Sequence, residues 1–270
     1  MPSLYAHYTF GQKVKKLLPE EIQICIDLYK DQYDLGLQGP DVLFFYRPLK
    51  MNPVRYLGHK LHKKPAAFYF KKMLAVVEEK GPYSPEAAYM LGVLCHFMLD
   101  SRVHPYVNRK MEETGLGHID MEGEFEKYLM YRDWVRPEQY PVWKHVPVSR
   151  SIFQTVGNMY PWISRYHAAA SVCYFHFCKW IATAQCPVKK NFFMWAIKKM
   201  GLEEKLRGQY IWDDLNEKAI PVSEGFAELY DDEINKAAAM EEQLWRIIRS
   251  DKKEKFPVRF KQNFDGIEVV

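Results

Sequence analysis

Three histidines and two carboxylates lie close together along the first half of the chain. His96 precedes Asp100 by four residues, His118 precedes Glu122 by four residues, and His104 lies between the two pairs. Side chains four residues apart lie on one face of a helix, with their Cβ atoms about 5–6 Å apart. Each pair can therefore grip one ion through an imidazole nitrogen and a carboxylate oxygen, a donor set that suits zinc or a neighbouring first-row metal.

The alternative for a single pair of this kind is an ion pair on a helix surface. His96 and Asp100, however, belong to the near-apolar stretch "AAYMLGVLCHFMLD". A carboxylate buried there without a partner would be costly. A metal ion is an economical partner, and a second pair so close by further weakens the surface alternative. We therefore predict a metal site.

More candidate ligands lie upstream of these pairs. Six of the nine histidines fall within the first 118 residues, among them His7, His59 and His62. Asp41 follows Gly-Pro in the loop "GLQGPDVLFFY". Acids on ordered loops often serve functional sites, although an Asp-initiated turn is the plain alternative for Asp41.

The elements that must position these side chains are predicted to be helices. Strand alternation is scarce, and helical spacing with start and stop signals predicts helices over 18–33, 65–81, 84–105, 118–134 and 223–251, with two or three more between 150 and 199. The helix over 84–105 is apolar nearly all round, which is typical of a buried central helix. Residues 34–58 read as an ordered loop, and the polar tail 252–270 as an ordered strap. We predict one all-α domain over 1–270, with metal ligands in 1–130 and helical cover in 131–270.

Composition limits the possible roles of this domain. The chain has 270 residues, of which 48% are hydrophobic, so a large core can form. The net charge of +4 is too small to indicate nucleic-acid binding through bulk charge. Five cysteines without a CxxC pair argue against a disulfide framework. The N-terminal segment lacks a secretory pattern, and no apolar run is long enough to cross a bilayer. These features predict a cytoplasmic protein without a transmembrane segment.

The candidate ligands also follow a known order along the chain. The ordered set is His7, Asp41, His59 or His62, His96, Asp100, His104, His118 and Glu122. It resembles the ligand series of zinc-dependent phospholipase C, whose all-helical fold is shared with single-strand-specific S1/P1 nucleases. Stretches such as "LGHKLH" and "LCHFMLDSRVHPY" resemble a bacterial, cytoplasmic branch of that family. The resemblance covers roughly residues 1–130 and implies Zn²⁺ as the cofactor.

The resemblance also implies how the ligands divide among the ions. One zinc ion would be held by Asp41, His62, His96 and Asp100. A second would be held by His104, His118 and Glu122. A third would use His7, with Asp100 or Asp41 bridging. His62 matches the family position better than His59, which is expected in an outer shell or facing the substrate.

Two features depart from the family pattern. In secreted members the processed N-terminal residue binds a metal through its amino group, whereas this chain begins Met-Pro-Ser, so Pro2 would have to supply that amine. The interval from His96 to His104 is two residues shorter than usual. We therefore expect the turn between these histidines to differ.

The predicted activity is hydrolysis of phosphodiester bonds, phospholipase C-like, by a water molecule that the metal activates. Asp41 is the candidate to orient or deprotonate that water, and Tyr46, Arg47 and Arg102 are candidates for binding the substrate. The sequence contains no Gly-x-Ser-x-Gly motif, no phosphate loop and no His-Glu-x-x-His motif, each of which would indicate a different chemistry.

The predicted partner is a lipid or small-molecule phosphodiester, with transient contact at a membrane surface. Nucleic acid is less favoured. Three alternatives stay open: a single-strand nuclease, a protein with purely structural zinc, and a membrane-surface or partner-binding module that uses its amphipathic helix over 224–249.

Overall fold

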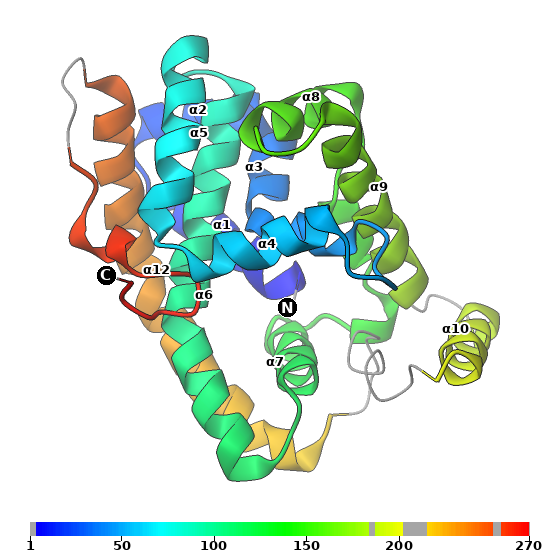
Figure 1. Ribbon diagram of the computed structural model, residues 1–270. Coiled ribbons are helices and arrows are strands. Elements are labelled where there is room, and N and C mark those ends of the chain that lie inside the picture. Colours follow the sequence, from blue (N-terminus) through cyan, green and yellow to red (C-terminus); the bar gives the residue numbers. More distant parts are fainter. Residues whose placement is uncertain (1–3, 184–186, 202–214, 251–254, 270) are drawn as a thin grey trace.

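A helix of 30 residues, α6 (Pro85–Thr114), runs through the centre of the molecule (Figure 1). It begins after Ser84, whose hydroxyl accepts a hydrogen bond from the Ala87 backbone N–H, and it ends at Gly115 in the left-handed conformation. Every side chain from Glu86 to Ser101 is buried. The computed structural model thus confirms the predicted buried central helix. It describes residues 4–183, 187–201, 215–250 and 255–269.

Helix α6 extends further than the sequence predicts. The predicted stop at Pro105, and the expected turn between His96 and His104, are both wrong, because the helix continues through Pro105 without a break. A proline removes only one backbone donor, so the carbonyl of Ser101, four residues earlier, is the acceptor that loses its helical partner. As a result His96, Asp100 and His104 lie at four-residue intervals on one helix.

Shorter helices from the first half of the chain surround α6. They are α1 (Leu4–Lys15), α2 (Glu20–Leu28), α3 (Lys30–Gly36), the 3-10 helix η1 (Gly39–Phe45), α4 (Pro53–Lys63), α5 (Ala66–Lys80) and α7 (His118–Arg132). The helix predicted over 18–33 is split at Tyr29, whose φ of −129° and ψ of 45° interrupt it. The stretch predicted as a loop over 34–58 contains η1 and the start of α4.

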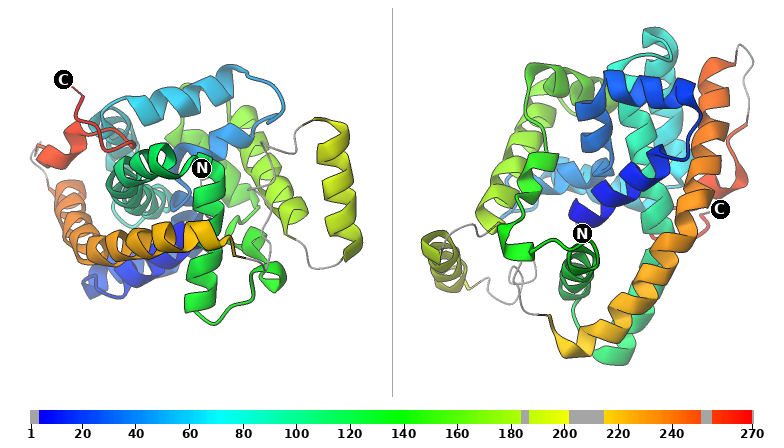
Figure 2. Two further views of the ribbon diagram at one scale, coloured as in Figure 1. Left: turned by 90° about the horizontal axis from the view of Figure 1, so that it is seen from below. Right: turned by 180° about the vertical axis from the view of Figure 1, so that it is seen from behind.

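The second half of the chain covers this assembly. It comprises η2 (Pro137–Gln139), η3 (Val142–His145), α8 (Arg150–Met159), α9 (Arg165–Ala182), α10 (Pro187–Lys199), η5 (Glu217–Ala219), α12 (Ile220–Arg249) and η6 (Val258–Lys261). Helix α12 packs along α6 and also contacts α7 and α1 (Figure 2). Helix α10 lies at the periphery, beside α9 (Figure 1). The all-α class is confirmed, and among the described residues no helix is long and apolar enough to cross a membrane.

The apolar side of α12 faces inward. Phe226, Tyr230 and Leu244 are buried, and the ring of Phe226 stacks on Phe125 of α7 with centroids 3.6 Å apart. The hypothesis that this helix offers an exposed apolar stripe to a membrane or a partner is therefore wrong. The stripe forms part of the core.

Candidate metal centre

Asp100 of α6 lies at the centre of a cluster of imidazoles. Its Oδ2 lies 3.1 Å from Nε2 of His96, and its Oδ1 lies 3.2 Å from Nε2 of His7 and 3.9 Å from Nε2 of His104. Because His96 and His104 lie four residues before and after Asp100, one face of α6 presents all three side chains. The carboxylate itself is buried.

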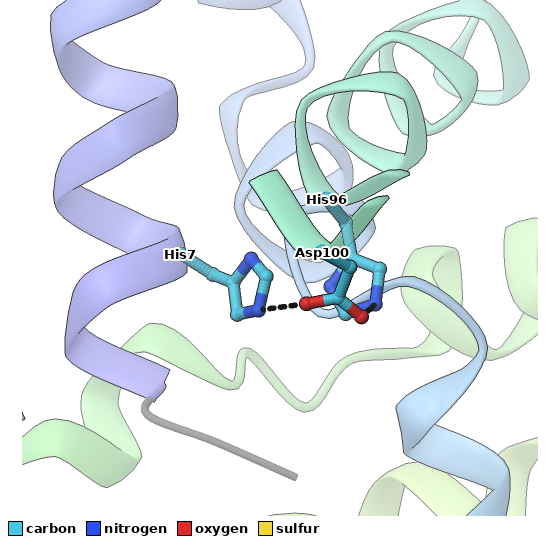
Figure 3. Close-up of side chains that lie close together, drawn as sticks. All are labelled: His7, His96 and Asp100. Atoms are coloured by element: carbon cyan, nitrogen blue, oxygen red, sulfur yellow. Dashed lines mark ion pairs between the residues drawn. The ribbon is translucent and has the colours of Figure 1, made fainter. Parts of the chain in front are cut away.

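Helix α1 brings His7 to this face. Figure 3 shows its ring beside His96 and Asp100. The rings of His7 and His96 are stacked with centroids 4.2 Å apart, and both side chains are buried. His7, His96 and Asp100 thus form one group whose ligand atoms lie within 4.8 Å of one another.

The 3-10 helix η1 and helix α4 bring a second carboxylate and a further imidazole. Oδ1 of Asp41 lies 2.9 Å from Nε2 of His62 and 3.9 Å from Nε2 of His96. Gly39, with φ of +51°, allows this approach, because a Cβ atom there would lie only 2.4 Å from Cδ2 of His96. Asp41, His62 and His96 form the second group of potential metal ligands.

The third group lies at the N-terminus of α7. Oε1 of Glu122 lies 2.7 Å from Nε2 of His118 and 3.6 Å from Nε2 of His104. Glu122 is buried, whereas the His118 side chain is 30% exposed, more than its partners. His104 also faces Asp100, so it joins this group to the other two.

Three imidazoles are oriented from behind by backbone carbonyls. Nδ1 of His62 lies 2.8 Å from the Gly58 oxygen, Nδ1 of His96 lies 3.1 Å from the Leu37 oxygen, and Nδ1 of His104 lies 3.0 Å from the Phe264 oxygen. A carbonyl only accepts hydrogen bonds, so Nδ1 of each ring carries the proton. A neutral ring therefore directs the Nε2 lone pair toward the carboxylates, which is the arrangement of a metal-ligating histidine.

The ligand atoms lack the hydrogen bonds that burial demands. Oδ1 of Asp41, Oδ1 of Asp100 and Nε2 of His62, His96 and His104 are buried and form no hydrogen bond in the described structure. Nitrogen lone pairs facing carboxylate oxygens are acceptors facing acceptors, which is costly unless a cation lies between them. The donor set of imidazole and carboxylate fits zinc, with no soft thiolate among the ligands.

The pKa shifts of Asp100 and His104 agree with a site that holds a cation. Burial alone would raise the pKa of Asp100, yet the facing imidazoles of His96, His104 and His7 hold it well below its usual value. Burial would lower the pKa of His104, but Asp100 and Glu122 outweigh burial and raise it to about 9. Both shifts show that the cluster favours positive charge between its side chains, whether carried by protons or by a metal.

The remaining predicted residues lie outside the three groups. His59 is exposed on α4, with its ring 4.4 Å from that of Phe44, so the structure brings His62 and not His59 into a group. Tyr46 is buried among aromatic rings, 5.2 Å from His167 and 5.9 Å from Tyr174.

The two predicted substrate arginines differ in position. Arg47 is exposed, has a φ of 45°, and places its guanidinium over the ring of Tyr46. Arg102 faces α12, where it lies 3.3 Å from Asp232 and 3.7 Å from Glu233. These acids neutralise Arg102 in this structure. The predicted amine of Pro2 lies outside the described residues.

Sequence reasoning missed the groups that orient the ligands. The carbonyls of Leu37, Gly58 and Phe264 belong to the backbone, which every residue type shares, so no pattern of side chains marks them. Phe264 also lies far from every predicted ligand along the chain.

Comparison with known proteins agrees with this geometry. A family model described as zinc dependent phospholipase C matches residues 6–175, a span that contains every candidate ligand from His7 to Glu122. Searches of curated proteins and of solved structures found no significant match. The matched span covers more than half of the chain. The chain therefore belongs to the zinc dependent phospholipase C family.

Proposed function

We propose that the protein is a zinc-dependent hydrolase of phosphodiester bonds, with phospholipase C-like activity. The observation that carries this proposal is the convergence of three His/carboxylate groups on the buried Asp100. Buried acceptor atoms without a hydrogen bond, such as Oδ1 of Asp100 and Nε2 of His96, are costly unless a cation lies between them.

We further propose how the ligands are shared. One zinc ion would be held by Asp41, His62, His96 and Asp100, and a second by His104, His118 and Glu122. His7, 3.2 Å from Asp100, would serve a third ion or complete the first. His96 and Asp100 each belong to more than one set of contacts, which supports ions that lie close together.

Zinc bound at such a site lowers the pKa of water toward neutrality and polarises a phosphoryl oxygen. The side chains of the protein would orient the water, accept its proton and determine where the substrate enters. Oδ1 of Asp41 faces both His62 and His96, and we propose that the other carboxylate oxygen of Asp41 orients the attacking water and accepts its proton. His118 is the most exposed of the proposed ligands, so we propose that the substrate approaches from the N-terminus of α7.

The exposed face of α10 supports a lipid substrate. Val188, Phe192 and Trp195 follow one another at helical spacing and are 78%, 60% and 57% exposed. The helix contains four lysines and no acidic residue. Exposed aromatic side chains flanked by lysines are typical of a helix that lies on an anionic membrane surface. We propose that α10 makes the transient membrane contact, on the inner side of a bacterial cytoplasmic membrane.

Metal analysis of the purified protein, followed by assays on a panel of substrates, tests this function. The panel would contain short-chain phosphatidylcholine, phosphatidylglycerol vesicles, bis-p-nitrophenyl phosphate and single-stranded DNA, each with and without chelator and with zinc restored. We expect zinc-dependent release of a phosphorylated head group from lipid. Turnover of DNA alone would instead identify a nuclease, and tightly held zinc without any turnover would identify a structural metal site.

A further inference from the structure

The C-terminal strap, residues 255–269, lies against the metal centre although it falls outside the span that the family model matches. The Phe264 side chain is fully buried. Its ring lies 5.1 Å from that of His62 and 5.8 Å from that of His96, measured between centroids. The strap therefore touches ligands contributed by two different helices, α4 and α6.

The backbone of Phe264 joins these helices. Its carbonyl faces Nδ1 of His104 at 3.0 Å, and its N–H donates to the His62 carbonyl at 3.2 Å. Gly58 and Leu37, which orient the other two imidazoles, lie within the matched span. His104 alone among the three is oriented by a residue more than one hundred positions away.

Asp265 adds a negative charge beside the same nitrogen. Its Oδ1 lies 3.7 Å from Nδ1 of His104, while its Oδ2 lies 2.7 Å from Nζ of Lys63. A carbonyl and a carboxylate together favour a proton on Nδ1, which leaves Nε2 as the ligand atom. Outer groups of this kind orient metal-ligating histidines and raise their basicity.

The turn that carries Phe264 and Asp265 has a defined fit on α6. Oδ1 of the buried Asn263 accepts hydrogen bonds from the N–H groups of Asp265 and Ile267. Gly266 has φ of +73°, and a Cβ atom there would lie 2.3 Å from the Ser101 carbonyl oxygen. That carbonyl is the one that Pro105 leaves without a helical donor. The turn thus lies where the helix ladder is interrupted.

A second anchor holds the strap upstream of this turn. Arg259 lies 2.9 Å from the fully buried Glu233 of α12, and its guanidinium donates to the Met98 carbonyl and to the Ser101 hydroxyl. The Gln262 carbonyl accepts a hydrogen bond from the N–H of Ala66 at the start of α5. These contacts fix the strap to three helices before it reaches the metal centre.

We propose that the C-terminal strap is a positioning device for the metal centre, in which Phe264 and Asp265 hold His104 in its ligating orientation. This inference rests on the proposed zinc site. It adds two positioning residues that lie beyond the matched span, and it makes the tail a functional part of the centre.

The test uses Gly266→Ala in the full-length protein, with Gly81→Ala as the matched control. Both glycines have positive φ, but a Cβ atom at Gly81 meets nothing within 4 Å. Both variants place a Cβ atom on a residue with positive φ, and only Gly266→Ala also pushes the turn off α6. We expect Gly266→Ala to bind its weakest zinc ion about 10–100-fold less tightly, measured by competition with a chromophoric chelator. The control should bind zinc as the wild type does.

A milder pair of variants covers the case in which Gly266→Ala does not fold. Asp265→Asn keeps the backbone but removes the charge beside His104, and Lys63→Met removes the ion-pair partner but leaves that charge. We expect weaker zinc binding only in Asp265→Asn, together with a smaller rise in melting temperature on adding zinc.

A strap that merely covers the core gives a different result. Gly266→Ala and Asp265→Asn would then lower the melting temperature equally with and without zinc, and leave zinc affinity unchanged, which would overturn the inference. A wild-type protein that binds no zinc would overturn the proposed function itself, and this inference with it.

Discussion

At the scale of single residues, Asp100 is the carboxylate on which the candidate ligands converge. One buried carboxylate faces the imidazoles of His7, His96 and His104, which come from α1 and α6. The imidazoles hold its pKa well below the usual value despite burial, so the group is ionised at neutral pH. Its charge is the link between the proposed zinc ions.

Asp100→Asn should therefore remove zinc. An amide lacks the charge that binds the cation. Where free zinc is present at one hundred times its Kd, loss of zinc binding lowers the free energy of unfolding by about 2.7 kcal/mol. For a chain of this size, that corresponds to a melting temperature lower by about 5–10 °C. Zinc content and thermal melting measure both effects. Asp232→Asn, which alters an exposed ion pair on α12, is the control, and equal zinc content and melting in the two variants would contradict the site.

Sequence alone predicted part of this centre. The four-residue spacing marks the pairs His96/Asp100 and His118/Glu122 because helix geometry is local. The same helix geometry determines the position of Arg102. Two residues after Asp100, Arg102 lies on the opposite side of α6, so nearness in sequence does not bring it to the candidate ligands, and its binding to a phosphate stays a prediction. The carbonyls that orient the histidines depend on tertiary packing, which no local pattern contains.

At the scale of elements, the contact between α6 and α12 encloses an acid. Glu241 of α12 is fully buried, and Cys95 of α6 donates to its Oε1 from 3.2 Å. Burial raises the pKa of Glu241 well above its usual value. Between the unfolded and folded pKa values the folded state binds a proton that the unfolded state has lost, so stability falls as the pH rises through this range.

Glu241→Gln should abolish that fall, because the amide keeps an acceptor for Cys95 and does not ionise. We expect the variant to gain melting temperature relative to the wild type at pH 8 and to gain little at pH 5. Thermal melting of both proteins at the two pH values, with the same chelator present, measures the difference. Glu242→Gln, at the exposed neighbouring position, is the control. A gain that does not change with pH would contradict the assignment.

Helix α10 gives a second prediction at this scale. Trp195→Ala should weaken binding to phosphatidylglycerol vesicles about 10–150-fold, since burying one large aromatic side chain in the interface is worth roughly 1.5–3 kcal/mol. Vesicle co-sedimentation at low salt measures the binding. Leu28→Ala removes a comparably exposed apolar side chain from α2 and should leave binding unchanged. Equal binding by all three proteins would rule out α10 as the membrane contact.

Some helix starts were readable from the sequence, whereas helix lengths were not. Ser84-Pro85 carries the capping residue and the proline that begin α6, as predicted. The prediction of a loop over 34–58 missed the same signal at Asn52-Pro53, where α4 begins. The end of α6 was not readable, because a proline stops a helix only where tertiary contacts do not support it. Here the strap packs against the interrupted turn.

At the scale of the whole molecule, both ends of the chain share one core. Leu4 of α1 and Phe264 of the strap belong to the same cluster of buried apolar side chains, together with α6 and α12. The sequence predicts a single domain over 1–270, with ligands early and cover late. The single domain stays a prediction, and the structure adds that part of the late segment contacts the candidate ligands.

A single cooperative unfolding transition should follow. Scanning calorimetry should give equal calorimetric and van't Hoff enthalpies of unfolding. The two halves of the chain share one core, so neither half can unfold while the other stays folded. Chelator should move the transition to lower temperature without splitting it. Two resolved transitions, one of which ignores chelator, would show instead that the second half of the chain folds as a separate unit.

The unbroken helix α6 has a consequence for how this protein can vary. Each residue turns an α-helix by about 100°, so one extra residue between His96 and His104 would swing one histidine away from the other. No loop lies between them to absorb the change, and the ligand groups on both sides would be lost together. Substitutions can accumulate along this stretch, but its number of residues cannot change. A scan of single-residue insertions should therefore find that the eight insertion points between His96 and His104 are the least tolerant in the chain.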